Sequence, residues 1–200
     1  MNQEMLFTAT KWDILSILSK EGKSPIQIAK IAKTSVANVS QQLRLLEMAG
    51  LVASVRVPNR DRGQPRLVYS LVKSTAMIIL LEPHHAEKKQ ITLNAKRSAV
   101  IKILLLDDEA KSDQLFRMFM SFEDDLDRIK ALYADFSNQT LYIVSDDDRV
   151  KKKHLAASVQ KKSFKCQFVS AHDAQSRMKG DFFVLYDPSH LKKNEGEVVL

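Results

Sequence analysis

The sequence has a single cysteine, no long apolar run and no internal repeat, and each absence excludes a class of protein. Cys166 alone cannot form an intrachain disulfide or a zinc site built from several cysteines, which fits a reducing compartment. No stretch reaches the roughly 18 apolar residues that span a bilayer, and the N-terminus lacks a charged segment followed by an apolar run. We therefore expect a cytoplasmic protein with no membrane partner.

The chain carries an excess of positive charge that is concentrated near its N-terminus. Lys and Arg number 31 against 24 Asp and Glu, for a net charge of +7 and a pI of about 9.4. Residues 1–72 hold ten basic and five acidic residues, net +5, whereas residues 73–136 (ten and eleven) have net −1 and residues 137–200 (eleven and eight) net +3. A basic excess favours a polyanionic partner, and its position points to the N-terminal third.

Three short helices are predicted in this basic third. Apolar residues at mixed spacings of three and four indicate a first helix over Thr10–Lys20, which Gly22 is expected to end. Ser24 and Pro25 form the pattern of a helix cap followed by a proline at the first helical position, so a second helix begins there. After a tight turn, Ser35 is expected to cap a third helix.

The third helix is predicted to have one packed face and one free face. Its apolar stripe consists of Val36, Val39, Leu43 and Leu46. The opposite, polar face carries Ala37, Ser40, Gln41 and Arg44. Helical periodicity separates the two faces, so that one packs in a core and the other meets solvent or a ligand.

A β-hairpin with a basic tip is predicted to follow these helices. Residues Leu51–Val57 are rich in β-branched side chains, and Arg66–Leu71 alternate apolar and polar residues. The segment Pro58–Pro65 between them has the composition of a loop and contains Arg60 and Arg62. Three short helices followed by a basic hairpin describe a winged helix-turn-helix.

Two segments resemble the ArsR family of repressors. Residues Ser40–Val52 look like the recognition helix and helix end of ArsR-type repressors, whose pattern is Ser-x-His-Leu-x-x-Leu-x-x-Ala-Gly-Leu-Val. Residues Gly63–Leu71 are similar to the wing of archaeal members. The resemblance covers about residues 8–72 and implies a winged helix-turn-helix transcriptional regulator that binds double-stranded DNA.

The chain departs from the family pattern in ways that bear on metal sensing. Gln42 stands where histidine is common, and the cysteine-rich metal-sensing motif of some members is absent, so a thiolate metal site is not expected. His84 and His85 are adjacent, so on a strand they would point to opposite faces and could not easily share one ion. We interpret them as exposed loop histidines and expect neither a metal nor a cofactor.

Nine residues of the N-terminal third are predicted to contact DNA. They are Ser35, Ala37, Asn38, Ser40, Gln41, Arg44, Arg60, Arg62 and Arg66. Gln41 can pair bidentately with adenine, Arg44 can reach a phosphate or a guanine edge, and the amide of Ser35 can hold a phosphate at the helix N-terminus. Arg60 and Arg62 would reach the DNA backbone or the minor groove from the wing. A winged helix that contacts protein instead of DNA is the alternative.

The middle of the chain is predicted to hold two strands and one long helix. Ala76–Leu81 and Gln90–Leu93 are possible partner strands, and Ala99–Leu106 fits either a buried strand or a helix. Residues Glu109–Phe136 contain no Gly or Pro and place apolar residues at helical spacing, which predicts one helix of about seven turns. Because its polar face is acidic, we expect this helix to pair two subunits rather than to bind DNA.

The last third alternates strands and helices, which is typical of a small α/β unit. The predicted strands are Leu141–Val144, Phe164–Val169 and Phe182–Tyr186, the predicted helices are Asp148–Lys162 and Asp173–Met178, and the tail Lys192–Glu197 is expected to be disordered. Asp146, Asp147 and Asp148 follow an apolar strand, a place where magnesium sites occur, but no phosphate loop or second acidic cluster accompanies them. We interpret them as acids that cap the next helix.

Together these patterns predict an α+β protein with three parts. Residues 1–75 would form the winged helix-turn-helix, residues 76–136 linker strands and a long dimerisation helix, and residues 137–200 a small α/β domain. We expect a sequence-specific transcription regulator that binds double-stranded DNA as a homodimer. An enzyme is not expected, because no nucleophile arrangement is recognisable in residues 137–200. Two alternatives stay open: the α/β unit is an effector domain for a small molecule or a protein, or the chain is a non-specific architectural DNA-binding protein.

Overall fold

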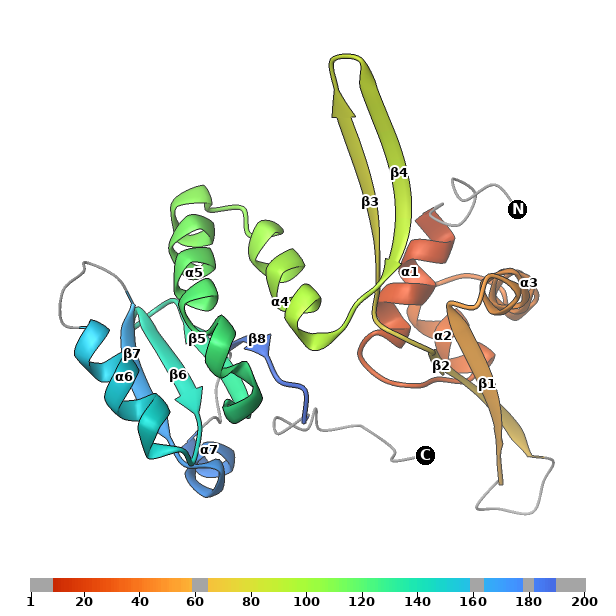
Figure 1. Cartoon of the computed structure of the whole chain (residues 1–200). Helices are drawn as coiled ribbons and strands as arrows, with labels where there is room; N and C mark the ends of the chain where they lie inside the picture. Colours follow the sequence, from red (N-terminus) through yellow and green to blue (C-terminus); the bar gives the residue numbers. More distant parts are fainter. Residues whose placement is uncertain (1–8, 59–64, 159–163, 178–181, 190–200) are drawn as a thin grey trace. The chain divides into compact units, whose positions relative to one another are not determined.

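The computed structural model describes residues 9–58, 65–158, 164–177 and 182–189, which fall into two compact units (Figure 1). The boundary between the units lies between Ser74 and Thr75. The predicted tail Lys192–Glu197 lies outside the described residues. Within the described ranges, no helix combines the length and the hydropathy that a membrane span requires.

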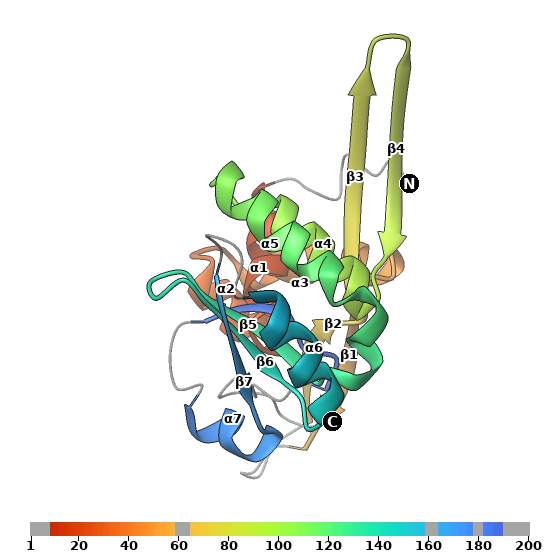
Figure 2. The same cartoon turned by 60° about the vertical axis from the view of Figure 1, so that its left-hand side comes forward.

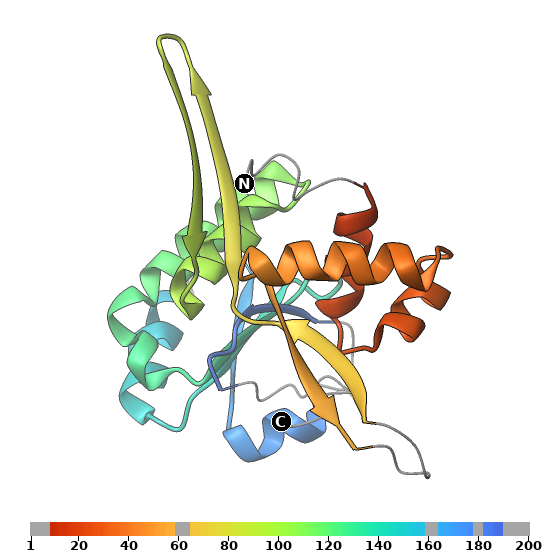
Figure 3. The same cartoon turned by 90° about the vertical axis from the view of Figure 1, so that its right-hand side faces the viewer.

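The N-terminal unit consists of three helices and a two-stranded antiparallel sheet (Figure 3). Its elements are α1 (Ala9–Leu18), α2 (Pro25–Ile31), α3 (Val36–Met48), β1 (Val52–Val57) and β2 (Arg66–Leu71). Side chains from all five elements meet in one buried apolar cluster, which includes Ile14, Ile28, Leu43, Val52 and Tyr69. The predicted helices and strands of this unit are confirmed with small shifts of their ends.

Local hydrogen bonds explain where the second and third helices begin. The backbone amide of Ser24 donates to Oε1 of Gln27 (2.9 Å), which is the reciprocal contact of a capping box. At the start of α3, Oγ of Ser35 accepts a hydrogen bond from the backbone amide of Asn38 (3.2 Å). Gly50 has a φ of 68°, the left-handed conformation that commonly follows a helix end.

Gly22 was expected to end α1, but α1 ends at Leu18 and the glycine has another role. An added Cβ at Gly22 would lie 3.2 Å from Cγ1 of Val68 and 3.3 Å from the carbonyl oxygen of Tyr69. The adjacent Lys23 donates a backbone hydrogen bond to Tyr69 (3.0 Å) and accepts one from it (2.9 Å). The close approach therefore joins the loop before α2 to the wing and fixes the wing against the helices.

The C-terminal unit begins with a long two-stranded hairpin. β3 (Thr75–Glu82) pairs antiparallel with β4 (His85–Thr92), and among the described residues this pair forms a sheet of its own. His84 in the connecting turn has a φ of 66°. The two predicted strands are present, and β4 starts well before the predicted Gln90–Leu93, because the charged residues in its first half do not show the apolar alternation of a half-buried strand.

A four-stranded sheet forms the centre of the remaining C-terminal unit (Figure 2). Its strands lie in the order β7-β6-β5-β8, with β6 parallel to β7 and β5 antiparallel to β6 and β8. The elements are α4 (Ala95–Leu104), α5 (Glu109–Ser121), the 3-10 helix η2 (Glu123–Arg128), β5 (Ala131–Asp135), β6 (Thr140–Val144), α6 (Asp148–Ser158), β7 (Lys165–Val169), α7 (Ala171–Arg177) and β8 (Phe183–Tyr186). The three strands and two helices predicted for the last third are confirmed within the described residues.

Both faces of the sheet are covered. Leu132 and Ala134 of β5 face a core that α4, α5 and α6 share, whereas Ala131 and Tyr133 face the side of α7. The segment Ala99–Leu106, for which the sequence allowed a strand or a helix, forms most of α4 and turns two of its apolar side chains into the first core.

The prediction of one long helix over Glu109–Phe136 is wrong. α5 ends at Ser121, η2 follows, and the chain is extended again from Ala131. The cause is that both faces of β5 are buried, so its apolar residues run without interruption and fit a helical period as well as a strand.

Because the long helix is absent, the dimer contact and the domain boundary that were derived from it also have to be revised. Leu115 and Phe119 of α5 are buried in the core of their own unit. The apolar face that was expected to pair two subunits therefore packs within one subunit. The expected boundary between residues 136 and 137 falls between β5 and β6, which are paired neighbours in one sheet.

Candidate nucleic-acid interface

α3 has a fully buried face and an exposed face, as its sequence predicts. Val39, Leu43 and Leu46 have no solvent-exposed surface. On the other side, Ala37, Gln41 and Arg44 are exposed and follow one another at spacings of four and three residues. We call these three residues the recognition ridge, because side chains at this spacing lie in one row along a helix.

The start of α3 is held by hydrogen bonds among its own polar residues. The amide nitrogen Nδ2 of Asn38 donates to Oγ1 of Thr34 (3.1 Å), and its Oδ1 accepts a hydrogen bond from Nε2 of Gln42 (3.3 Å). Asn38 and Ser40 are half-buried, whereas Ser35 is exposed. The structure thus gives Asn38 a positioning role within the helix-turn-helix, in addition to any contact with DNA.

Val36 is the one residue of the predicted apolar stripe that is exposed instead of buried. Its side chain is 43% exposed at the first position of α3. The other three members of the stripe are buried as predicted.

A hydrogen bond joins the wing to α3. Oγ of Ser54 on β1 donates to Oε1 of Glu47 on α3 (2.8 Å). In the β1–β2 register Ser54 lies opposite Tyr69, and two residues further along the strand Arg56 lies opposite Leu67. Side chains two residues apart on a strand share a face, so Arg56 lies on the wing face that is turned towards α3.

The predicted wing arginines are distributed differently. Arg66 is exposed at the start of β2 and lies opposite Val57, which places it on the wing face opposite that of Arg56. Arg60 and Arg62 lie outside the described residues. Arg56 was not among the residues predicted from sequence. The two-residue period places it on the face of Ser54, but only the contact of Ser54 with Glu47 shows that this face is turned towards α3.

The positive charge of this surface is not neutralised within the described residues. Arg44, Arg56 and Arg66 are exposed, and none of the three forms an ion pair with an acid in the described part of the chain. Side chains that are fixed to a rigid helix and hairpin, and whose charge is uncompensated, are suited to contact phosphates.

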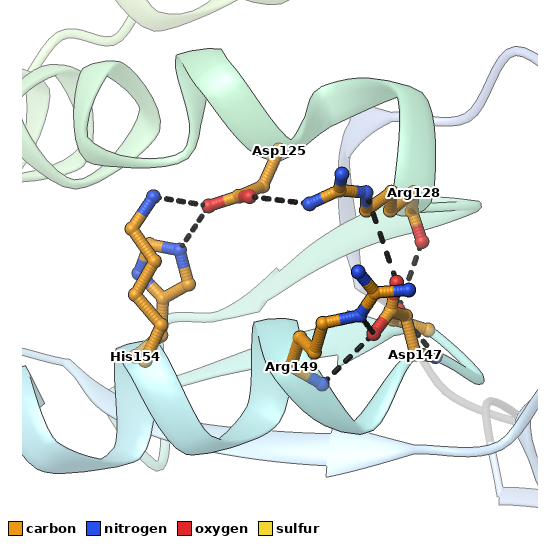
Figure 4. Close-up of polar contacts among 7 residues, drawn as sticks. Asp125, Arg128, Asp147, Arg149 and His154 are labelled. Atoms are coloured by element: carbon orange, nitrogen blue, oxygen red, sulfur yellow. Dashed lines mark hydrogen bonds and ion pairs between the residues drawn. The ribbon is translucent and has the colours of Figure 1, made fainter.

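A second cluster of polar residues lies in the C-terminal unit, between η2 and α6 (Figure 4). Asp125 is 4% exposed and accepts hydrogen bonds from Nζ of Lys153 (2.7 Å) and from Nε2 of His154 (2.9 Å). Arg128 lies 3.6 Å from Oδ1 of the same carboxylate. The His154 ring lies against that of Phe122 at a centroid distance of 4.3 Å, with the two ring planes tilted by 39°.

The contacts of Asp125 indicate a structural rather than a catalytic role. Hydrogen bonds from Lys153 and from His154 lower the pKa of Asp125 below its ordinary value. Its partners on α6 hold that helix against η2, and the carboxylate is enclosed by groups that stabilise its charged form. This contact joins residues almost thirty positions apart, and no local pattern in the sequence predicted it.

The three consecutive aspartates after β6 also contact the protein itself. Asp146 accepts hydrogen bonds from Nζ of Lys130 (2.6 Å) and from the backbone amide of Ala171 (3.3 Å), and these bonds lower its pKa. Asp147 accepts a hydrogen bond from the backbone amide of Arg149 (2.8 Å) at the start of α6. The predicted capping of the helix is therefore confirmed at Asp147.

The remaining candidate side chains are placed as follows. His84 and His85 are both exposed, in the turn and at the start of β4, and Nε2 of His85 lies 3.8 Å from the carboxylate of Glu87. Cys166 on β7 is half-buried beside the core, and burial raises the pKa of its thiol. A raised pKa disfavours the reactive thiolate.

Comparison with known proteins agrees with this geometry. Residues 8–54 match the sequence model of the family described as bacterial regulatory protein, arsR family. The match covers the three helices and the start of β1, which is less than half of the 200 residues. No curated protein matches the chain. The matched segment is an ArsR-like helix-turn-helix, the kind of domain with which transcription regulators bind DNA.

Proposed function

We propose that this protein regulates transcription by sequence-specific binding to double-stranded DNA, with α3 in the major groove and the wing on the adjacent backbone. The observation that carries the proposal is the recognition ridge. Three exposed residues project from a helix whose opposite face is fully buried, and the ridge carries a guanidinium group with no acidic partner among the described residues. The major groove of B-DNA admits a helix of this kind.

Each member of the ridge has a distinct role in this proposal. Ala37 has no long side chain, so the helix can approach the base edges closely at its N-terminal half. Gln41 can donate and accept hydrogen bonds at once, which suits the N6 and N7 atoms of adenine. Arg44 can reach a phosphate or the O6 and N7 atoms of guanine.

The wing adds contacts that do not depend on base sequence. Arg56 lies on the wing face that is turned towards α3, and the hydrogen bond between Ser54 and Glu47 fixes that face relative to the helix. We propose that Arg56 contacts a phosphate next to the groove that α3 enters. Arg60, Arg62 and Arg66, which the sequence assigned to the same task, stay predictions.

We further propose that two copies bind one pseudo-palindromic site. Helix-turn-helix proteins commonly bind as dimers to half-sites about 34 Å apart, one turn of the duplex. Two copies double the number of base pairs that are read, which a short ridge such as this one needs for specificity.

The experiment that tests the proposal is selection of duplexes from a random library at two salt concentrations. The full chain should enrich one motif, and its affinity should fall steeply as salt rises, because bound phosphates release counterions. Gln41→Ala should relax the preference at one position of each half-site, at a cost of about 1–3 kcal/mol. Gln167→Ala, at an exposed glutamine of β7, is the matched control and should select the same motif as the unmodified protein. Equal recovery of all duplexes would instead identify an architectural protein.

A further inference from the structure

The β3–β4 hairpin leaves an apolar strand in contact with solvent. Ile79 is 61% exposed and Leu81 is 75% exposed, and the neighbouring Ile78 and Leu80 are exposed as well. A two-stranded hairpin is at best marginally stable in water on its own, and exposed apolar strands are places where another chain adds. The hairpin therefore has the properties of an incomplete sheet.

The two edges of this hairpin differ sharply in charge. Residues Ala76–Leu81 of β3 are six consecutive apolar side chains with no charge and no proline. On β4, Glu87, Lys88 and Lys89 form a run of three charged residues at its middle. Charged side chains on an edge strand, lysine above all, prevent pairing with another sheet, so β4 is protected against pairing and β3 is not.

Two such hairpins can pair edge to edge in three ways. Only the pairing of β3 with β3 both stops at two copies and brings no charged side chain into the centre of the contact. Pairing β4 with the β4 of another copy, antiparallel about Lys88 or Lys89, would place one lysine opposite the same lysine of the other copy and would take the charged side chains of both strands into the contact, which charged edge strands resist. Pairing β3 with β4 of another copy would leave a free β3 at one end and continue into an open filament. Pairing β3 with β3 joins identical edges about a two-fold axis and ends there.

We propose that two copies of this chain dimerise by antiparallel pairing of their β3 strands into one four-stranded sheet, in the order β4-β3-β3-β4. A two-fold axis perpendicular to the sheet requires residues of the same face to lie opposite each other. The register is therefore centred on Ile78 or on Ile79, each opposite its own copy. In either register the residues Met77–Leu80 lie opposite apolar side chains only.

The resulting contact has the composition of a stable interface. Apolar side chains of the two β3 strands form its centre on both faces of the sheet, and the charged residues of the two β4 strands lie at its outer edges, which is the arrangement of an apolar core with a polar rim. Backbone hydrogen bonds along β3 fix the register, and the side chains exclude water from them.

This inference rests on the proposed function in one respect, since a regulator that reads two half-sites needs two copies. In this proposal the dimer contact is β3, whereas the sequence predicted a long helix over Glu109–Phe136 in that role. Dimerisation through β3 and DNA binding through the recognition ridge use different residues, so each can fail without the other.

Sedimentation equilibrium of the full chain tests the dimer with two matched variants. The unmodified protein should be a dimer. Ile79→Lys places two like charges at the two-fold axis or one position from it, depending on the register, and buries them in the apolar contact, so it should raise the dimer dissociation constant by about 100-fold or more. Ala86→Lys adds the same charge to the same hairpin, on the outer strand β4, and should leave the dimer intact. Far-ultraviolet circular dichroism should be the same for all three proteins.

A cross-link provides a second measurement that does not depend on how well the lysine variant folds. In a Cys166→Ala background, Ile78→Cys and Ile79→Cys are made separately, and the one at the centre of the register should form an interchain disulfide on oxidation, whereas Ala86→Cys should not. A monomeric unmodified protein, a dimeric Ile79→Lys variant or oligomers larger than a dimer would each overturn the proposal. If the dimer behaves as expected but the unmodified protein binds no duplex, the proposed function fails while the β3 contact stands.

Discussion

α3 and α5 have the same length, and each buries one face. Their solvent-exposed faces can therefore be compared directly. Both helices have 13 residues, and each has three buried side chains. On α5 the two exposed basic side chains are paired: Lys111 lies 2.9 Å from Asp108, and Arg117 lies 3.6 Å from Asp113. These pairs satisfy the charges locally.

The exposed face of α3 is composed differently. Its recognition ridge holds a methyl group, an amide and a guanidinium group, and Arg44 has no acidic partner among the described residues. Burial therefore shows only that both helices are packed. The exposed face decides which of them is available to a polyanion, because a charge that is already paired gains less from a phosphate.

The largest expected effect concerns the buried face of α5. Phe119→Ala should lower the free energy of unfolding by about 3–5 kcal/mol, because the ring is fully buried among core side chains. Phe116→Ala, on the same helix but 38% exposed, should cost much less. Urea unfolding monitored by circular dichroism measures both variants. Equal losses would show that α5 does not pack as described.

The next effect concerns the contact of η2 with α6. Asp125→Asn keeps the shape of the side chain and removes its charge, and it should cost about 1–3 kcal/mol, since the buried partner His154 loses a charged acceptor. Asp124→Asn, at the exposed neighbouring position, is the control and should change stability little.

The same carboxylate gives a prediction about pH. Because its partners lower the pKa of Asp125, its charge stabilises the fold above the ordinary Asp pKa of about 3.9, and this contribution is lost as the pH falls from there through the folded-state pKa. The difference in unfolding free energy between the unmodified protein and Asp125→Asn should therefore shrink on acidification below that value. A difference that stays constant to low pH would contradict the assigned cause.

The smallest expected effect concerns the wing. Arg56→Ala should weaken binding to all duplexes by a similar factor and reduce the slope of log affinity against log salt by about 1, as the loss of one phosphate contact does. Lys165→Ala, at an exposed lysine of β7, should leave the slope unchanged. Fluorescence anisotropy titrations at several salt concentrations measure both. A loss confined to one duplex sequence would mean that Arg56 reads a base instead.

The N-terminal unit could be predicted from sequence because its signals are local. Ser24 and Ser35 cap the helices that follow them within three residues, and Gly50 provides a left-handed residue directly after α3. The recognition ridge follows from helical periodicity alone, once those ends are known. The position of Arg56 required the strand register as well, which the sequence does not state.

The C-terminal unit was predicted less well because its determinants are not local. β5 pairs with β6 on one side and with β8 on the other, and both of its faces are covered. The apolar spacing of this segment also fits a helix, and these tertiary contacts determine that it forms a strand. The contact of Asp125 with His154 depends on two elements that the sheet brings together. Neither feature leaves a pattern within a short stretch of sequence.

The most direct test of the comparison between α3 and α5 is a pair of charge reversals on the two exposed faces. Arg44→Glu on α3 and Arg117→Glu on α5 change the net charge of the protein equally, and both positions are exposed. Binding of each variant to the selected duplex should be measured by fluorescence anisotropy at one salt concentration. We predict a loss of about 100-fold or more for Arg44→Glu and a small change for Arg117→Glu. Equal losses in the two variants, or full affinity in Arg44→Glu, would contradict the assignment of the recognition ridge as the surface that binds DNA.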